Sequence, residues 1–239
     1  MKREGISVEP EPPATCHLPL AYLQTCHTYG HNMPPSSTTP LTPRFEEALV
    51  FATQLHARQL RKGNGVPYIA HLLSVTGLVL EAGGDEDEAI AALLHDAVED
   101  QGGLETLTEI RRRFGDRVAE IVDGCSDTYT IPKPLWRKRK ETYIAHLREA
   151  TPEVRRVSLA DKLHNARSIL RDLRKDGAAT WDKFSGGKEG TLWYYRTLVQ
   201  VYSEIENEFM VDELARVVAQ MEEMRDIVPK AQRSVMREI

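Results

Sequence analysis

The stretch His95-Asp96-Ala97-Val98-Glu99-Asp100 governs how the rest of this sequence is interpreted. It directly follows the apolar run Ile90-Ala91-Ala92-Leu93-Leu94, where an ionisable group is costly unless a partner compensates its charge. The acidic turn Asp85-Glu86-Asp87-Glu88 precedes that run and suits a helix N-terminus. Together these pieces predict a buried helix that carries an adjacent His-Asp pair at the end of an apolar core segment.

Two other segments supply matching side chains. His71 closes the segment 67–71, and Asp161 follows the apolar residues 157–160. Taken singly, His71 is more often a packed histidine, and Asp161 could simply pair with a neighbouring arginine or lysine. Several ionisable residues at the ends of apolar runs are typical of a metal site between helices. Imidazole with carboxylate suits Mn²⁺, Fe²⁺ or Zn²⁺ better than Ca²⁺ or Mg²⁺. We therefore predict one divalent metal ion, with the ligands His71, His95, Asp96 and Asp161.

The sequence from Thr42 onward reads as helix. Thr42 and Pro43 are typical of a helix start, and apolar residues then recur at helical spacing as far as His56. No alternating strand pattern and no internal repeat is present. Further helices are expected from near residue 68, from 85 to the His-Asp pair, and over 104–114, 116–122, 134–150, 152–176, 190–209 and 211–227. The sequence thus predicts an all-α domain, a multi-helix bundle around the metal site.

Residues 1–41 differ from the rest. Seven prolines and the polar patch at residues 36–39 predict a disordered tail. The cysteines and histidines at residues 16, 17, 26, 27 and 31 match no established zinc pattern, so we favour a tail over a second metal site. Met33 stands just before the helical pattern, and one hypothesis is that the start codon has been placed too far upstream. We expect tails over 1–41 and 231–239, with the helical domain over 42–230.

Bulk composition restricts the class of protein. The 239 residues fit one domain with a substantial core. A formal charge of −5 argues against general nucleic-acid binding, although a small anionic ligand responds to local charge. No apolar run reaches membrane-spanning length, and no signal-peptide pattern opens the chain. Three scattered cysteines imply no disulfide framework, so a reducing cytoplasm is expected.

Taken in order, the motifs resemble the HD-domain metal-dependent phosphohydrolases. More specifically, the HDxxED box at residues 95–100 resembles that of the RelA/SpoT hydrolase domain and of the small alarmone hydrolases. The bare His-Asp pair is weakly specific, whereas the full set in this order is strongly specific. The resemblance covers about Phe45 to Phe209. The other matching segments are 56–62, 67–71, 114–115 and 159–165.

The resemblance implies a reaction. In that family a metal ion, usually Mn²⁺, is held by the residues that match the four predicted ligands, and pyrophosphate is removed from the ribose 3′ position of ppGpp or a similar nucleotide. A divalent ion lowers the pKa of bound water and neutralises phosphoryl charge. Glu99 is expected to act as general acid/base, with Asp100 orienting the water or the ligands. The alternative for this acidic pair is a solvated helix end.

The expected substrate contacts are basic, amide and aromatic side chains. Arg61 and Lys62 precede a glycine-containing turn that lets the backbone come close to a phosphate or a base. Asn165 lies one helical turn after Asp161, and the resemblance makes it a nucleotide-binding residue. The basic cluster at residues 133–140 is more often a solvated helix face, and helical aromatics are more often core. The candidates are Arg61, Lys62, Asn165, Lys138, Arg139 and Tyr195.

One loop departs from the family pattern. Residues 63–66 are one residue longer than usual and lack the family's serine. This loop borders the base site, so guanine and adenine nucleotides, ppGpp-type and pppApp-type, both stay open. The chain is too short for the synthetase and regulatory domains of the long enzymes, so we expect it only to degrade.

Two other functions stay open from the sequence. One is an HD phosphatase of another phosphorylated nucleotide, such as NADPH or a deoxynucleotide. The other is a metal-loaded nucleotide sensor without turnover. The intact Glu99-Asp100 pair and the Arg61-Lys62 element favour the pyrophosphohydrolase.

Overall fold

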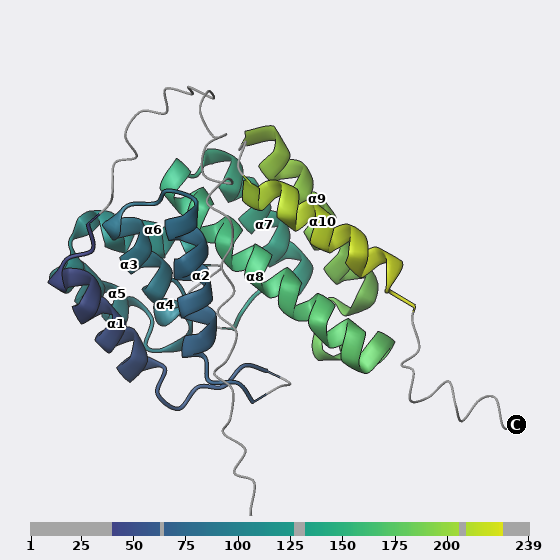
Figure 1. Ribbon diagram of the computed structural model, residues 1–239, viewed down its shortest axis with the longest axis horizontal. Coiled ribbons are helices and arrows are strands. Elements are labelled where there is room, and N and C mark those ends of the chain that lie inside the picture. Colours follow the sequence, from purple (N-terminus) through teal and green to yellow (C-terminus); the bar gives the residue numbers. More distant parts are fainter. Residues whose placement is uncertain (1–39, 63–64, 127–131, 206–208, 227–239) are drawn as a thin grey trace, which may run out of the picture. The chain divides into compact units, whose positions relative to one another are not determined.

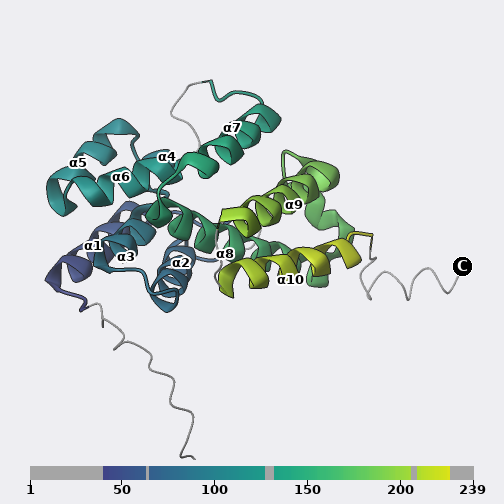
Figure 2. The same ribbon diagram turned by 90° about the horizontal axis from the view of Figure 1, so that it is seen from above.

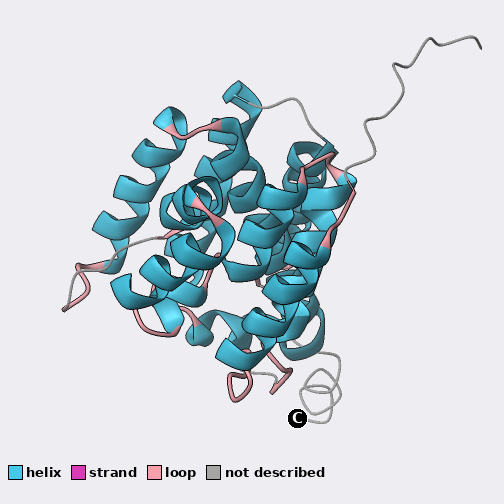
Figure 3. Ribbon diagram, turned by 90° about the vertical axis from the view of Figure 1, so that its left-hand side faces the viewer, coloured by secondary structure: helices cyan, strands magenta, loops and turns pink. Residues whose placement is uncertain are grey.

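The structure is a computed structural model that describes residues 40–62, 65–126, 132–205 and 209–226. Within these ranges it consists of helices and loops (Figure 3), apart from one isolated antiparallel bridge between Leu60 and Pro67. The predicted all-α fold is therefore confirmed. The expected tails, including the cysteines and histidines at 16–31, lie outside the described residues except for residues 40 and 41.

The helices follow one another with short connections. In chain order they are α1 (Pro43–Leu55), α2 (Ile69–Glu81), α3 (Glu86–Leu94), α4 (Ala97–Asp100), α5 (Leu104–Phe114), α6 (Asp116–Cys125), α7 (Trp136–Glu149), α8 (Pro152–Asp176), the 3₁₀ helix η2 (Gly177–Lys183), α9 (Gly187–Ile205) and α10 (Phe209–Glu223).

Capping residues explain where several helices begin. The Thr42 side chain accepts a hydrogen bond from the backbone N–H of Arg44, with Pro43 as the first residue of α1. Asp85 and Glu88 form a reciprocal capping box at the start of α3. The Thr151 side chain accepts a hydrogen bond from the backbone N–H of Val154 at the start of α8, where Pro152 is the first residue. At its other end, α8 stops at Gly177, whose φ of 63° favours glycine.

The His-Asp pair lies at a break between two helices. α3 ends at Leu94, His95 is its C-cap residue, and Asp96 is the N-cap residue of the one-turn helix α4. In an unbroken helix, successive side chains point in directions about 100° apart. The break instead allows His95 Nε2 and Asp96 Oδ2 to come within 3.0 Å of each other.

Two helices organise the core. α3 is buried along the whole segment Glu88–Leu94, and it packs against α1, α2, α6 and α8. The 25-residue α8 runs between α2 on one side and α10 on the other (Figures 1 and 2). The metal-site candidates on α2, after α3 and on α8 therefore converge where these three helices meet. No helix in the described part of the chain is long and apolar enough to cross a membrane.

Candidate metal centre

The structure brings the four predicted ligands together. His71 on α2, His95 after α3 and Asp161 on α8 are buried and offer ligand atoms that all lie within 4.8 Å of one another. The Oδ2 atom of Asp96 lies 3.4 Å from His71 Nε2 and 3.0 Å from His95 Nε2. His71 Nε2 is also 3.2 Å from Asp161 Oδ1. Two imidazoles and two carboxylates thus face one point.

The hydrogen bonds of the two histidines indicate which kind of ligand fits between the four side chains. His95 Nδ1 lies 2.8 Å from the Ala92 carbonyl oxygen, which can only accept, so Nδ1 carries the proton and Nε2 of the neutral ring is left as an acceptor. Within the described ranges, the buried Nε2 atoms of His71 and His95 have no hydrogen-bond partner. They face carboxylate oxygens, which are also acceptors. A divalent cation satisfies all of these groups at once, so the donor set fits a metal ion.

The pKa shifts of His95, Asp96 and Asp161 also favour a cation at this site. Burial lowers the pKa of His95, but the carboxylates of Asp96 and Asp161 outweigh burial and raise that pKa to about 10. In turn, the imidazoles hold the pKa of Asp96 well below its ordinary value against the effect of burial. For Asp161 the Lys162 ammonium is the largest of the charges that lower the pKa. The site therefore favours positive charge between its imidazoles and carboxylates.

A second set of side chains orients these groups. Tyr68 donates its hydroxyl hydrogen to Asp96 Oδ2 over 2.6 Å. Lys162 and Asn165 donate to the two oxygens of Asp161, each over 2.5 Å. His164 lies behind His71, with its Nδ1 atom 2.7 Å from His71 Nδ1. Such contacts fix the rotamers and tautomers of metal ligands. Only Asn165 was singled out from the sequence, although helical spacing from Asp161 and from His71 also points to His164 and Tyr68.

A cavity of about 660 Å³ adjoins the centre. Arg61 donates to Asn165 Oδ1 over 2.6 Å, and its guanidinium lies 5.5 Å from the centroid of the Tyr68 ring. The structure thus joins two predicted substrate contacts from distant segments. The lining combines cations, aromatic rings and polar groups: Gln59, Leu60, Arg61, Lys62, Tyr68, Asp100, Trp136, Lys140, Lys162, Asn165, Ser168, Ile169, Asp172, Lys183, Phe184, Ser185, Thr191, Tyr194 and Tyr195.

The comparison with protein families agrees with this geometry. The model of the HD domain matches residues 48–192, which include all four candidate ligands. The chain belongs to the HD-domain family.

Individual relatives and solved structures extend the comparison. The guanosine-3′,5′-bis(diphosphate) 3′-pyrophosphohydrolase of Xenopus tropicalis is 39% identical over 140 residues, which are 57% of this chain and 73% of the relative. A metazoan SpoT ortholog described as hydrolysing ppGpp has a similar structure, with a TM-score of 0.62 and 26% identity over 76% of this chain and 97% of that one. A Listeria monocytogenes protein matches with a TM-score of 0.56 and 32% identity, over 65% of this chain and 98% of its own.

The acidic pair of the HD-domain motif divides between two environments. Glu99 forms an ion pair with Lys133, with 2.7 Å between Oε1 and Nζ. Asp100 lines the cavity and accepts a hydrogen bond from Gln59 Nε2 over 2.7 Å. Partial desolvation raises the pKa of Asp100, and the charges of Asp96 and Glu99 raise it further, against the Gln59 hydrogen bond. Asp100 is therefore the carboxylate that is better placed toward a cavity ligand.

The cavity-lining residues of α7 are Trp136 and Lys140, whereas the sequence singled out Lys138 and Arg139. Trp136 and Lys140 lie one helical turn apart. Lys138 is exposed, and Arg139 donates its Nε–H to the Pro134 carbonyl oxygen. Neither Lys138 nor Arg139 is among the lining residues, so the geometry gives their predicted phosphate contacts no support. By contrast, Arg61, Lys62, Asn165 and Tyr195 all line the cavity.

Proposed function

We propose that this chain is a divalent-metal-dependent 3′-pyrophosphohydrolase of guanosine-3′,5′-bis(diphosphate) or of its adenosine counterpart. One observation carries the proposal. A site of two imidazoles and two carboxylates opens beside a cavity with cationic and aromatic walls. The names of the similar proteins support the same substrate. Mn²⁺ is the proposed ion, and Fe²⁺ or Zn²⁺ suits the same donors.

Charge balance explains the distribution of basic residues. When bound, a divalent ion at this site supplies a water of lowered pKa and neutralises phosphoryl charge. The two carboxylates of Asp96 and Asp161 already balance the charge of such an ion. A nucleotide with two diphosphate groups therefore needs other cations to balance its negative charge. Arg61, Lys62 and Lys140 line the cavity and provide positive charge there.

The proposed reaction breaks the bond between phosphorus and the ribose 3′ oxygen. Water attacks the phosphorus attached to O3′ and loses a proton, and O3′ takes up a proton as pyrophosphate leaves. Glu99 and Asp100 are the proposed proton-transfer pair. Asp100 lies on the cavity wall, where Gln59 donates a hydrogen bond to its carboxylate, and the neighbouring Glu99 forms an ion pair with Lys133.

Nucleotide binding is assigned to Arg61 and the polar and aromatic side chains near it. The Arg61 guanidinium is held by Asn165 and lies near the Tyr68 ring, so its plane is prepared for a base or a phosphate. Tyr195 offers a further ring to the same cavity. Arg61 donates a hydrogen bond to Asn165, and Asn165 donates one to Asp161. This series of hydrogen bonds couples the proposed nucleotide contacts to the candidate metal ligands.

Metal replacement tests the proposal. The chain is stripped with a chelator, reloaded with Mn²⁺, Zn²⁺ or Mg²⁺, and assayed with guanosine-3′,5′-bis(diphosphate). We expect no turnover in the stripped chain and full recovery with Mn²⁺. Equal turnover in the stripped and reloaded chains would contradict a metal-dependent hydrolase.

A further inference from the structure

On one wall of the cavity, Lys140 and Lys162 lie near the buried ring of Tyr143, which is not itself a lining residue. The Nζ atom of Lys162 lies 4.8 Å from the centroid of the Tyr143 ring, and that of Lys140 lies 6.0 Å from the same centroid. Lys140 Nζ is also 5.1 Å from the centroid of the Tyr194 ring. Lys162 donates a hydrogen bond to the candidate ligand Asp161, so its ammonium group lies next to the candidate metal centre. Lys140 continues the positive charge along the same wall.

Hydrogen bonds hold the Tyr143 ring in place. The Tyr143 hydroxyl lies 2.5 Å from the Ser158 hydroxyl, which also accepts a hydrogen bond from Tyr202 over 2.8 Å. All three residues are buried. The Tyr143 ring, which both lysines approach, is therefore held by the buried hydroxyl groups around it.

The Tyr194 hydroxyl is a buried donor that needs an acceptor. Tyr194 is only 5% exposed and lines the cavity, yet its hydroxyl has no hydrogen-bond partner in the described part of the chain. An unmade hydrogen bond at a buried polar group carries a free-energy cost. A ligand oxygen in the cavity beside Lys140 would remove that cost.

We propose that Lys140, Lys162 and the Tyr194 hydroxyl bind the terminal phosphate of the 3′ diphosphate, and so select pyrophosphate over orthophosphate as the leaving group. This inference rests on the proposed function. The phosphate attached to O3′ lies at the metal centre, and the next phosphate reaches the lysines on the wall. A nucleotide with a single phosphate at this position would leave the Lys140 subsite without a ligand.

Other cations are less suited to this role. Lys183 also lines the cavity, but its ammonium lies 3.3 Å from Asp172 Oδ2 and 2.9 Å from Asp176 Oδ2. Two carboxylates balance that single charge. Lys140 is better placed for a ligand that also meets the Tyr194 hydroxyl, because its Nζ atom lies 5.1 Å from the centroid of the Tyr194 ring.

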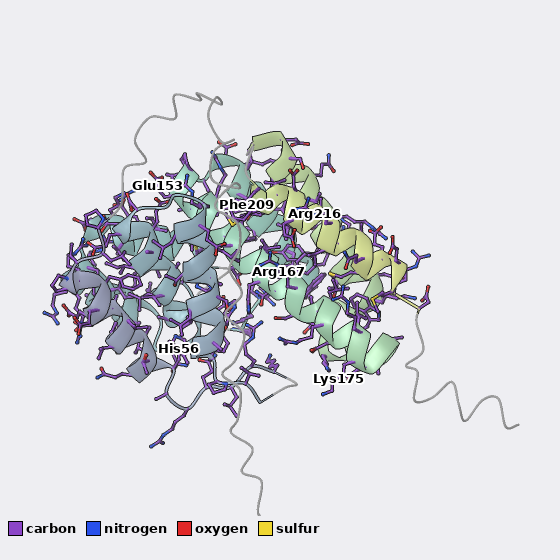
Figure 4. All side chains as sticks on the ribbon, in the orientation of Figure 1. His56, Glu153, Arg167, Lys175, Phe209 and Arg216 are labelled. Atoms are coloured by element: carbon purple, nitrogen blue, oxygen red, sulfur yellow. The ribbon has the colours of Figure 1, made fainter. Side chains whose placement is uncertain are left out.

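Equilibrium binding of inorganic pyrophosphate and of orthophosphate to the metal-loaded chain tests the subsite. The variants are Lys140→Met, Lys140→Arg and Tyr194→Phe. Lys175→Met is the matched control, because it removes one exposed lysine from the C-terminal end of α8 (Figure 4), outside the cavity lining. Isothermal titration calorimetry gives the affinities, and elemental analysis gives the metal content of each variant.

We expect Lys140→Met to weaken pyrophosphate binding about tenfold, the effect of one charge-assisted hydrogen bond, with orthophosphate binding and metal content little changed. Tyr194→Phe should cause a smaller loss of the same kind, while Lys140→Arg and Lys175→Met should bind pyrophosphate like the wild type. Unchanged pyrophosphate affinity in both Lys140→Met and Tyr194→Phe would overturn the subsite. If these affinities change as expected but the wild-type chain turns over no nucleotide, the proposed reaction fails and the subsite stands.

Discussion

His164 Nδ1 lies 2.7 Å from His71 Nδ1, so one imidazole stands directly behind another. Only one of these two nitrogens can donate the shared proton. Burial lowers the pKa of His164 to about 4, and the charges of His71 and Arg61 contribute to this. A neutral His164 accepts the proton of His71 Nδ1, and the Nε2 atom of His71 is thereby left to face the metal centre.

Replacing His164 should therefore weaken metal binding without removing a ligand. We expect His164→Ala to lower the Mn²⁺ affinity by about 10- to 100-fold. His164→Gln, whose side-chain oxygen still accepts a hydrogen bond, should lose less. Titration of the stripped proteins with Mn²⁺ measures this, and equal affinities for wild type and His164→Ala would contradict the orienting role.

Asp161 is expected to be indispensable for the metal. Asp161→Ala removes the carboxylate that faces both histidines, and Lys162 then brings an unbalanced positive charge to the site. We expect elemental analysis to find no bound metal and assays to find no turnover. The control is Asp116→Ala, an exposed carboxylate on α6. Metal retention by Asp161→Ala would exclude it as a ligand.

The two carboxylates of the HDxxED box should differ in effect. Asp100→Asn removes the carboxylate on the cavity wall and should lower kcat by about 10²- to 10⁴-fold, with bound metal retained. Glu99→Gln also removes a carboxylate, but one that is paired with Lys133, and we expect a smaller loss. The decisive comparison is kcat for the two variants at equal metal content. A more damaging Glu99→Gln would return the main proton-transfer role to Glu99.

Glu88 should matter for stability. Its side chain is 4% exposed, closes the capping box of α3 and forms an ion pair with Arg156 on α8. Removing one partner of a buried pair costs about 3–5 kcal/mol. We expect Glu88→Ala to lose that much in urea unfolding, and Glu88→Gln, which retains a capping oxygen, to lose less. A Glu88→Ala loss below about 1 kcal/mol would mean that the pair is effectively solvated.

His56 should make stability depend on pH. Burial lowers its pKa below 6.5, against the raising effects of Gln59, Asp96 and Asp100. As the pH falls through 6.5, the unfolded chain takes up a proton before the folded chain does, so stability decreases. The loss between about pH 7.5 and pH 5.5 should be smaller in His56→Gln than in the wild type. Identical losses in urea unfolding would contradict a neutral, buried His56, which Figure 4 labels beyond the end of α1.

Most of the fold was predictable because its signals are local. The caps at Thr42, Asp85 and Thr151 fixed three helix starts within the sequence, and Gly177 marked the end of α8. The 3₁₀ helix over Gly177–Lys183 was not predicted, since it depends on the packing of Trp181 against the core. The helix was expected to run to the His-Asp pair, as α3 does, but the separate one-turn helix α4 after the pair was not predicted, because no glycine or proline marks its start.

The ligand set was predictable because ionisable side chains end several apolar runs of the sequence. His71, His95, Asp96 and Asp161 come together as expected from ionisable residues that end apolar runs. The rotation of α7 was not predictable, because its basic residues 137–140 offer a cation on every face. Only packing of Trp136 against α9 shows that Lys140, rather than Lys138 or Arg139, turns to the cavity.

The central claim is tested most directly by the products of metal-dependent hydrolysis. The Mn²⁺-loaded chain is incubated with ppGpp and, in parallel, with pppApp, and the products are resolved by ion-exchange chromatography. We predict release of pyrophosphate from at least one of the two nucleotides, and their ratio of rates gives the base preference. Orthophosphate as the only product, or no turnover of either nucleotide with metal confirmed bound, would contradict a 3′-pyrophosphohydrolase.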